Sequence, residues 1–307
     1  MRPRGPSASH DYLVTGGGSF IGRAIVEQLA SGGHSVATIL RTARPSLVAE
    51  YVEAGIDVQI GDLADPTFLS GLGLRADVIV HAAATSGAGF VGVRKLEQDN
   101  VAATAEVVAF ADRTVCGHLI ALSTVSVHGR IAGGVISERT GFVGPDAYGF
   151  TKRRAELLVT QAPQRGRRSV VRLPGVLGPG AHRIWLAQVV VDAAAGRDIN
   201  IYNPDAQFNN GVLVDDLVGF LSRLGALREQ GADAFPIASA SPVTIREIVE
   251  VVVSELGSDS RIVATASESE SFIIDDNHAR VEYGYTSLTI EAAVRRHARA
   301  FAATGVS

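Results

Sequence analysis

The chain has 307 residues, 46% of them hydrophobic, and a formal charge of −4. This length suits one large α/β domain or two smaller ones, and no apolar run approaches the length of a membrane span. The absence of a long basic run argues against a nucleic-acid binder, and the single cysteine excludes intramolecular disulfides. We therefore expect a soluble cytoplasmic protein with no nucleic-acid, membrane or metal partner.

Residues 1–10 contain Pro, Arg and Ser without an apolar core, which predicts a disordered lead-in and not a secretory signal. A short apolar run at 11–14 then ends in a glycine-rich turn at 15–22, and the helix predicted at 23–30 follows. A strand, a glycine turn and a helix form the context of dinucleotide binding, because the pyrophosphate rests on free amides at the helix N-terminus. The candidate contacts are Gly16, Gly18, Ser19, Phe20, Ile21 and Gly22.

A second strand, 35–40, leads into Arg41, with Arg44 close behind. Many NAD-binding proteins place an acidic residue here to hold the ribose hydroxyls. A guanidinium instead suits a 2′-phosphate, so the sequence favours NADP, with NAD as the alternative. An ordinary pair of surface arginines is the competing interpretation.

Further strands at 56–60, 77–80 and 119–122 alternate with helices, one of them from about 93 to 112. This alternation predicts a Rossmann-type, doubly wound parallel sheet. A ligand of such a sheet binds at the carboxyl ends of its strands. The residues that fall there are Asp62, Leu63, Ala82, Ala83, Ala84, Ser123 and Thr124.

Tyr148 and Lys152 are four residues apart, so they share one face of the helix predicted at 148–159. A phenol has a pKa of roughly 10, and a neighbouring ammonium group favours its phenolate form. The pair is therefore a candidate proton donor and acceptor for interconverting a carbonyl and an alcohol. A surface helix turn with a solvated lysine is the alternative.

Taken together, these motifs resemble the extended short-chain dehydrogenases/reductases, the family of NAD(P)-dependent nucleotide-sugar epimerases, dehydratases and reductases. The resemblance covers nearly the whole chain. The matching segments are 15–22, 61–63, 81–83, 100–104, 123–129, 148–152, 172–180 and 212–217.

The resemblance implies a role for each matching residue. Tyr148 would be the catalytic acid/base, Lys152 would bind the nicotinamide ribose and lower the tyrosine pKa, and Thr124 would hydrogen-bond the reacting oxygen beside Ser123. Asp62 and Leu63 would flank the adenine, and Asn100 would contact the cofactor. The substrate contacts would include Thr85, Ser86 and Thr124. A homodimer formed through the helices around 95–112 and 148–160 is also implied.

Four features of the sequence depart from the family pattern or limit the chemistry. Ser19 replaces the middle glycine, which is tolerated if its φ is negative. Gly175 stands where many relatives have Asn. Sugar dehydratases carry Asp-Glu after the catalytic Thr, where this chain has Val125 and Ser126, so dehydration is disfavoured. Cys116 precedes the fifth strand, and we expect it to be inert packing.

We expect a dinucleotide-binding domain at 11–175 and a smaller α/β substrate domain at 176–307, with about 207–230 returning to the Rossmann core. In this second half, His182 and Arg183 could face a diphosphate or simply begin a helix that reaches about residue 195, and Asn209 could bind sugar hydroxyls or belong to a turn. Thr244 and Glu247 have capping-box spacing, and 275–278 should cap a short helix.

The sequence thus predicts an NADP-dependent oxidoreductase that reduces a keto carbon, C4 of a hexose, on a nucleotide-activated sugar. The first alternative is a nucleotide-sugar 4-epimerase that uses the same residues with tightly held NAD. A non-catalytic cofactor sensor or RNA-associated scaffold is the alternative of another class. The intact set of Thr124, Tyr148 and Lys152 argues against it.

Overall fold

The computed structural model describes residues 8–86, 91–131, 134–162, 165–182, 184–265 and 270–303. The chain forms two compact units. The first contains Met1–Val127, Pro145–Val171 and Leu221–Ala234, and the second contains His128–Gly144, Arg172–Phe220 and Phe235–Ser307. Residues 128–144 and 172–175, expected in the first domain, belong to the second unit, and the segment that returns to the first unit is 221–234.

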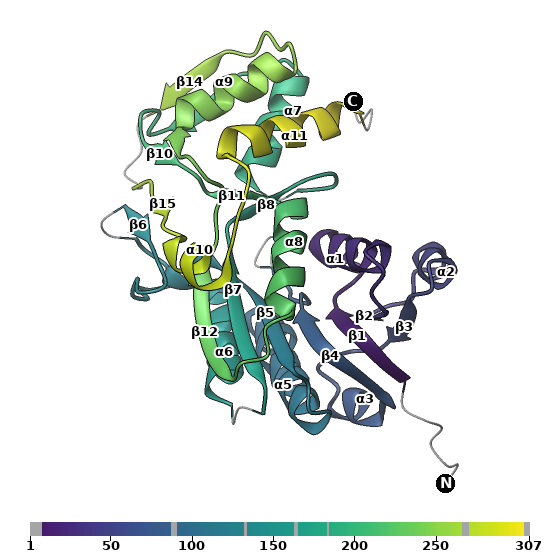
Figure 1. Ribbon diagram of the computed structural model, residues 1–307. Helices are drawn as coiled ribbons and strands as arrows, with labels where there is room; N and C mark the ends of the chain where they lie inside the picture. Colours follow the sequence, from purple (N-terminus) through teal and green to yellow (C-terminus); the bar gives the residue numbers. More distant parts are fainter. Residues whose placement is uncertain are drawn as a thin grey trace. The chain divides into compact units, whose positions relative to one another are not determined.

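A seven-stranded sheet forms the centre of the first unit, in the order β12-β7-β5-β4-β1-β2-β3 (Figure 1). The pairings between β3, β2, β1, β4 and β5 are parallel, with Val14 opposite Thr38 on one side and Val80 on the other. The strand order reverses between β1 and β4, which creates the crevice where such sheets bind ligands. The strands are β1 (Ala8–Thr15), β2 (Val36–Leu40), β3 (Asp57–Ile60), β4 (Leu74–His81), β5 (His118–Thr124), β7 (Arg167–Leu173) and β12 (Gly231–Pro236).

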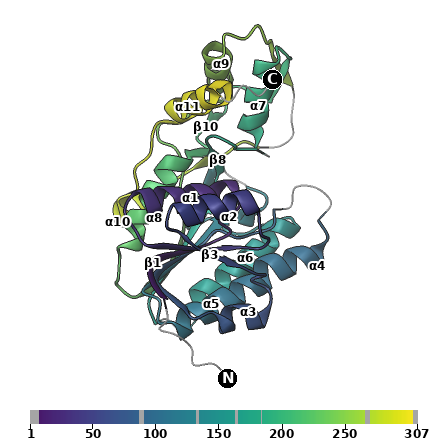
Figure 2. The same ribbon diagram turned by 90° about the vertical axis from the view of Figure 1, so that its right-hand side faces the viewer.

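Helices cover both faces of this sheet. In Figure 2, α1 and α2 lie on one face and α3, α5 and α6 on the other. Because both faces are covered, β2 is buried along its whole length and reads as a continuous apolar run. The helices are α1 (Phe20–Ser31), α2 (Pro45–Glu53), α3 (Pro66–Gly71), α4 (Val93–Leu96), the π-helix η1 (Glu97–Ala102), α5 (Ala103–Arg113), α6 (Ala147–Gln161), and the 3₁₀ turn η2 (Val125–His128).

The predicted elements of this half are confirmed, with small shifts at their ends. The lead-in expected at 1–10 lies outside the described residues up to residue 7, and Ala8–His10 belong to β1. The helix expected from 93 to 112 is helical throughout, but its middle is the π-helix η1.

The second unit packs three helices around a separate apolar core, formed by residues such as Leu186, Val190, Ile248, Val252 and Val294. Within the described ranges, this unit also contains four small two-stranded sheets. The elements are β6 (Val135–Ile136), β8 (Gly175–Leu177), α7 (Trp185–Ala194), β9 (Ile199–Tyr202), β10 (Gln207–Phe208), β11 (Gly211–Leu213), β13 (Val243–Thr244), α9 (Ile245–Glu255), β14 (Ile262–Thr265), β15 (Ile273–Ile274), α10 (Asn277–Tyr283) and α11 (Ile290–Ala303), and α8 (Val214–Gly225) is shared between the units.

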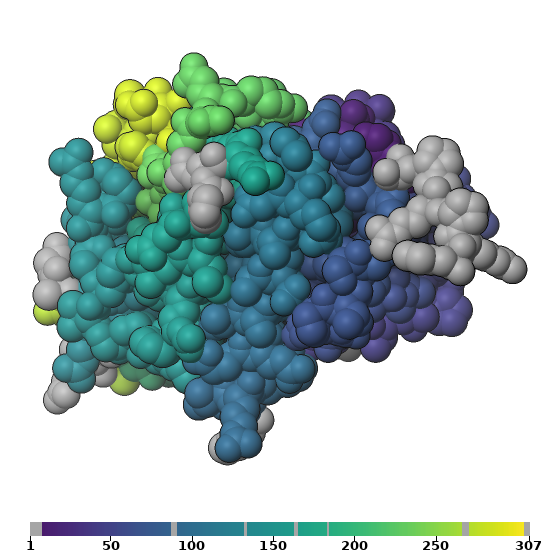
Figure 3. Space-filling model, turned by 90° about the horizontal axis from the view of Figure 1, so that it is seen from below, coloured from purple at the N-terminus to yellow at the C-terminus, as the bar shows by residue number. Residues whose placement is uncertain are grey.

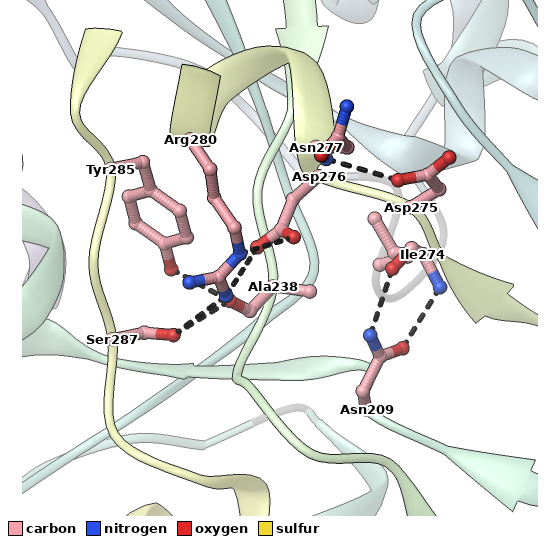
Figure 4. A network of polar contacts seen from close by, with 9 residues as sticks. All are labelled: Asn209, Ala238, Ile274, Asp275, Asp276, Asn277, Arg280, Tyr285 and Ser287. Atoms are coloured by element: carbon pink, nitrogen blue, oxygen red, sulfur yellow. Dashed lines mark hydrogen bonds and ion pairs between the residues drawn. The ribbon is translucent and has the colours of Figure 1, made fainter.

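The two helix caps predicted for this unit have different outcomes. The capping box of Thr244 and Glu247 is confirmed at the start of α9. Asp276 precedes α10 but gives it no side-chain cap, because its carboxylate is bound by Arg280 Nε at 2.7 Å. Asp275 instead accepts from the backbone amide of Asn277 at 3.0 Å (Figure 4). No helix in the described ranges is both long and apolar enough to cross a bilayer.

Candidate active site

The glycine turn after β1 brings the backbone of two strands unusually close together. Gly16 has a φ of +77°, and a Cβ on it would lie 2.8 Å from backbone atoms of Ala83, in the loop after β4. A Cβ on Gly22 would lie 2.1 Å from the carbonyl oxygen of Gly16. Only glycine fits at either position, so the turn presents bare backbone at the switch point of the sheet.

Ser19 stands at the position of the family's middle glycine and caps the helix that follows the turn. Its φ is −86°, as tolerance of a side chain requires, and it is the N-cap of α1. Its hydroxyl donates to the carbonyl of Gly16 at 2.8 Å and accepts from the amide of Gly22 at 3.1 Å. The predicted residues Phe20, Ile21 and Gly22 form the first turn of this helix. Its N-terminus faces the turn, which suits a pyrophosphate.

A pocket of about 290 Å³ opens beside this turn, entirely within the first unit. Ten of the residues expected to bind ligand line it: Gly16, Gly18, Ser19, Arg41, Arg44, Leu63, Ala82, Ala83, Ala84 and Thr85. Arg44 donates to the carbonyl of Gly18 at 2.9 Å, and Arg41 donates to Asp99 at the same distance. Bare backbone, a helix N-terminus and two guanidinium groups fit a dinucleotide.

Two residues expected to contact the cofactor make structural contacts within the protein. Asp62 accepts from the amide of Ala64 at 3.0 Å and so shapes its own turn, and the pocket wall is made by its neighbour Leu63. Asn100 is buried, and its amide binds both backbone groups of Thr85 and the hydroxyl of Thr151. We therefore assign Asn100 the positioning of the loop after β4, which also carries Ser86.

The three expected catalytic residues lie on β5 and α6 of the first unit. Thr124 is the last residue of β5, and its hydroxyl is 3.1 Å from both the amide and the hydroxyl of Ser126. Asp146 caps α6 by accepting from the amide of Gly149 at 2.7 Å, which fixes the helix turn that carries Tyr148 and Lys152. Lys152 is buried and donates to the carbonyl of Leu122 on β5 at 2.8 Å.

The pKa of Tyr148 is shifted upward, against the expected direction, and the pKa of Lys152 is shifted as well. Burial, with a contribution from the Asp146 carboxylate, raises the pKa of Tyr148 to about 12. Burial lowers the pKa of Lys152 to about 8, and Glu156 only partly opposes that shift. In the protein alone, burial thus outweighs any lowering of the Tyr148 pKa by Lys152. The lysine binds Leu122, and within the described ranges no hydrogen bond joins it to the phenol.

A buried carboxylate behind Lys152 was not predicted. Glu156 lies one turn further along α6 and accepts from Ser123 at 2.7 Å and from Arg153 at 3.0 Å. It therefore fixes Ser123, the residue expected beside the reacting oxygen. Nearby, His81 is buried between the hydroxyls of Thr15 and Thr104, and burial together with the Lys152 charge lowers its pKa to about 3. His81 is thus a neutral packing residue.

The predicted substrate residues of the second half lie in the second unit. His182 is exposed and contacts the carbonyl of Gly180, ahead of α7, which begins only at Trp185. Arg183 lies outside the described residues. Asn209 is buried, and its amide binds the backbone of Ile274 in both directions at 2.8 Å (Figure 4). Its side-chain amide therefore holds β15, and a sugar contact at Asn209 stays a prediction.

The second unit has its own pocket, of about 530 Å³, which the sequence did not indicate. Four aromatic rings dominate its wall, and Trp185 meets Phe208 edge to face with centroids 5.5 Å apart. Glu270 is the one charged residue on the described part of the wall. The lining residues are Trp185, Tyr202, Asn203, Phe208, Asn210, Ile245, Glu270, Ser271 and Phe272.

The fold and the first pocket define a dinucleotide-binding α/β protein of the Rossmann type. The sequence profile of the NAD-dependent epimerase/dehydratase family matches residues 12–237. The chain therefore belongs to the NAD-dependent epimerase/dehydratase family, whose members are NAD(P)-dependent reductases, epimerases and dehydratases.

Individual relatives have low sequence identity to the chain. The chain is 29% identical to dTDP-6-deoxy-L-talose 4-dehydrogenase (NAD(P)(+)) of Kitasatospora kifunensis, over 92% of each protein. It is 28% identical to 2-alkyl-3-oxoalkanoate reductase of Stenotrophomonas maltophilia, over 80% of this chain and 75% of that protein. Among solved structures, MoeE5 in complex with UDP-glucose and NAD superposes with a TM-score of 0.79 at 22% identity, covering 96% and 99% of the two chains. This last likeness shows the fold alone.

Proposed function

We propose that the protein is an NADPH-dependent reductase that acts on a 4-keto hexose carried by a nucleotide. The observation that carries this proposal is the intact set of Thr124, Tyr148 and Lys152 on β5 and α6, in the same unit as the glycine turn and Arg41. The talose 4-dehydrogenase relative, named for chemistry at C4 of a dTDP-sugar, supports the choice of substrate.

The residues present define how the pocket would hold the cofactor. The amides after Gly16 and the N-terminus of α1 would bind the pyrophosphate, Leu63 and Ala82 would flank the adenine, and Arg41 and Arg44 would bind the 2′-phosphate. When bound, NADPH supplies the hydride for the keto carbon.

Proton delivery falls to Tyr148. With its pKa raised to about 12, the phenol is protonated at neutral pH, so its proton is present to be donated to a keto oxygen. Thr124 orients that oxygen, and the buried Lys152 ammonium stabilises the tyrosinate left behind. A bulk proton then restores the phenol.

A direct assay tests this proposal. Purified protein, NADPH and a dTDP-4-keto-6-deoxyhexose should give stoichiometric NADP⁺ and a 4-hydroxy sugar. Tyr148→Phe should bind NADPH normally without turnover. Conversion of a UDP-hexose to its C4 epimer without net cofactor oxidation would instead support the epimerase.

A second candidate substrate is a 3-oxo acid with alkyl arms. The aromatic pocket of the second unit favours it, because the described part of the wall carries Glu270 but no basic side chain that would bind a diphosphate. The alkyl-oxoalkanoate reductase relative points the same way. Turnover of a 2-alkyl-3-oxo acid, with none of the keto sugar, would establish this candidate.

We also infer a homodimer formed through α5 and α6, as the family resemblance implies. These helices lie side by side in the view from below (Figure 3). A monomeric mass in solution at micromolar concentration would contradict the dimer.

A further inference from the structure

Asp99 is a buried carboxylate to which the mechanism gives no role. Its side chain is 0% exposed, yet it forms part of the wall of the first-unit pocket. It accepts from Arg41 Nη1 at 2.9 Å, from Lys95 Nζ at 2.7 Å and from the hydroxyl of Thr85. Burial alone would raise the pKa of Asp99, but the hydrogen bonds from Lys95, Thr85 and Arg41 hold that pKa below its usual value. The carboxylate is thus an anion at neutral pH.

The π-helix η1 explains why two consecutive side chains reach the same loop. In a regular α-helix, neighbouring residues diverge by about 100° around the axis. In η1, Asp99 binds the side chain of Thr85, and Asn100 binds its backbone amide at 2.8 Å and its carbonyl at 3.0 Å. Such π-turns are frequent at functional sites. Here the turn ties the loop after β4 to Arg41 at the end of β2.

A direct contact between Asp99 and a ribose hydroxyl is excluded by its complete burial. Its influence on a ligand must therefore pass through Arg41, which is 45% exposed at the same pocket. A guanidinium has five N–H donors in a planar fork. Asp99 takes one nitrogen, Nη1, and so fixes the plane of the fork while the rest remains for a ligand. Two cations share this one anion, so the cluster of Arg41, Lys95 and Asp99 stays net positive.

We propose that Asp99 is a positioning residue that sets the preference of this pocket for a dinucleotide with a 2′-phosphate, by fixing the guanidinium of Arg41. This proposal rests on the proposed cofactor, NADPH. Without Asp99, Arg41 would keep its charge but lose its fixed orientation, and would have to be ordered again at each binding event.

Calorimetric titration of the purified protein with NADPH and NADH tests this role without any need for turnover, and 2′,5′-ADP against 5′-AMP repeats the test without the nicotinamide. Asp99→Asn keeps the size of the side chain and removes its charge. Glu97→Gln is the matched control, because Glu97 lies on the same π-helix but pairs with Arg154 and does not line the pocket.

We expect Asp99→Asn to reduce the ratio of the NADH to the NADPH dissociation constant by about tenfold, with Glu97→Gln leaving the ratio unchanged. Arg41→Ala should abolish the preference, and adding Asp99→Asn to it should change nothing further, because the two residues act as one unit. A purely structural role would lower the melting temperature and weaken both dinucleotides equally. If Asp99→Asn does not fold, Asp99→Ser replaces it in the same comparison.

The outcomes separate the two proposals. A wild-type protein that binds NADH more tightly overturns the NADPH assignment and this role with it. A wild-type preference for NADPH that survives Asp99→Asn, or that falls equally in the Arg41→Ala background, overturns only the role of Asp99.

Discussion

The pockets of the two units differ in whether backbone or side chains line them. In the first unit the pocket is lined largely by backbone, which comes from the turn at Gly16, with its φ of +77°, and from the N-terminus of α1. In the second unit it is largely side chains, contributed by Trp185, Tyr202, Phe208 and Phe272 from separate segments. A backbone pocket needs specific residue types at fixed spacing, whereas a side-chain pocket tolerates many sequences. The first kind is therefore shared across a family, and the second distinguishes its members.

The largest effect should come from Tyr148→Phe, which removes the proton donor alone. We expect kcat to fall by about 10³-fold, within the usual range for loss of a general acid, with NADPH affinity unchanged. Stopped-flow turnover and calorimetry measure the two quantities. Retained turnover would remove Tyr148 from the mechanism.

Gly16→Ala probes the backbone pocket. The new Cβ would lie 2.8 Å from the backbone of Ala83, so we expect dinucleotide affinity to fall by about 30-fold, equivalent to about 2 kcal/mol. Gly33→Ala is the matched control, because Gly33 also has a positive φ, +87°, but has no atom within 4 Å of its Cβ position. The control should lose stability without losing affinity. Equal affinity losses in both variants would show that backbone strain, and not close approach, matters.

The pH dependence of kcat tests the burial of Lys152. Burial lowers its pKa from 10.5 to about 8, so the ammonium is lost as pH rises through 8. Because the charged form stabilises the tyrosinate, we expect kcat for reduction to fall about tenfold per pH unit above that point. Lys152→Arg, whose guanidinium does not titrate in this range, should remove the inflection. An unchanged inflection in that variant would assign it to another group.

Trp185→Ala probes the side-chain pocket and should have the smallest effect. Loss of one aromatic wall should raise KM for the keto substrate about tenfold and leave the NADPH dissociation constant unchanged. Val263→Ala is the control, since Val263 is a half-exposed residue of the same unit that does not line this pocket. A KM equal to that of the control would place the substrate elsewhere.

The difference between backbone features and side-chain contacts also separates what the sequence predicted from what it missed. The strand–turn–helix unit and the capping box of Thr244 depend on local backbone rules, and both are confirmed. Asp99 was missed because, with Lys95 four residues before it on a helix, it reads as an ordinary exposed ion pair. Nothing local shows that Arg41, on another element, completes its burial.

Long-range contacts and burial also account for what the sequence did not show about Asn209, Tyr148 and Lys152. Asn209 lies in a turn rich in Asn and Gly, which suggested free amides, but a strand far along the chain takes both groups. The spacing of Tyr148 and Lys152 correctly placed them on one helix, yet spacing does not reveal burial, and burial raises the pKa of Tyr148 and lowers that of Lys152.

The most direct test of the central claim is to denature the purified protein and identify any dinucleotide released, then to measure NADPH and NADH binding to the untreated protein. Our account predicts that little dinucleotide is released and that NADPH binds more tightly than NADH. Stoichiometric release of NAD⁺ would contradict it, because a cofactor held through successive turnovers belongs to an epimerase.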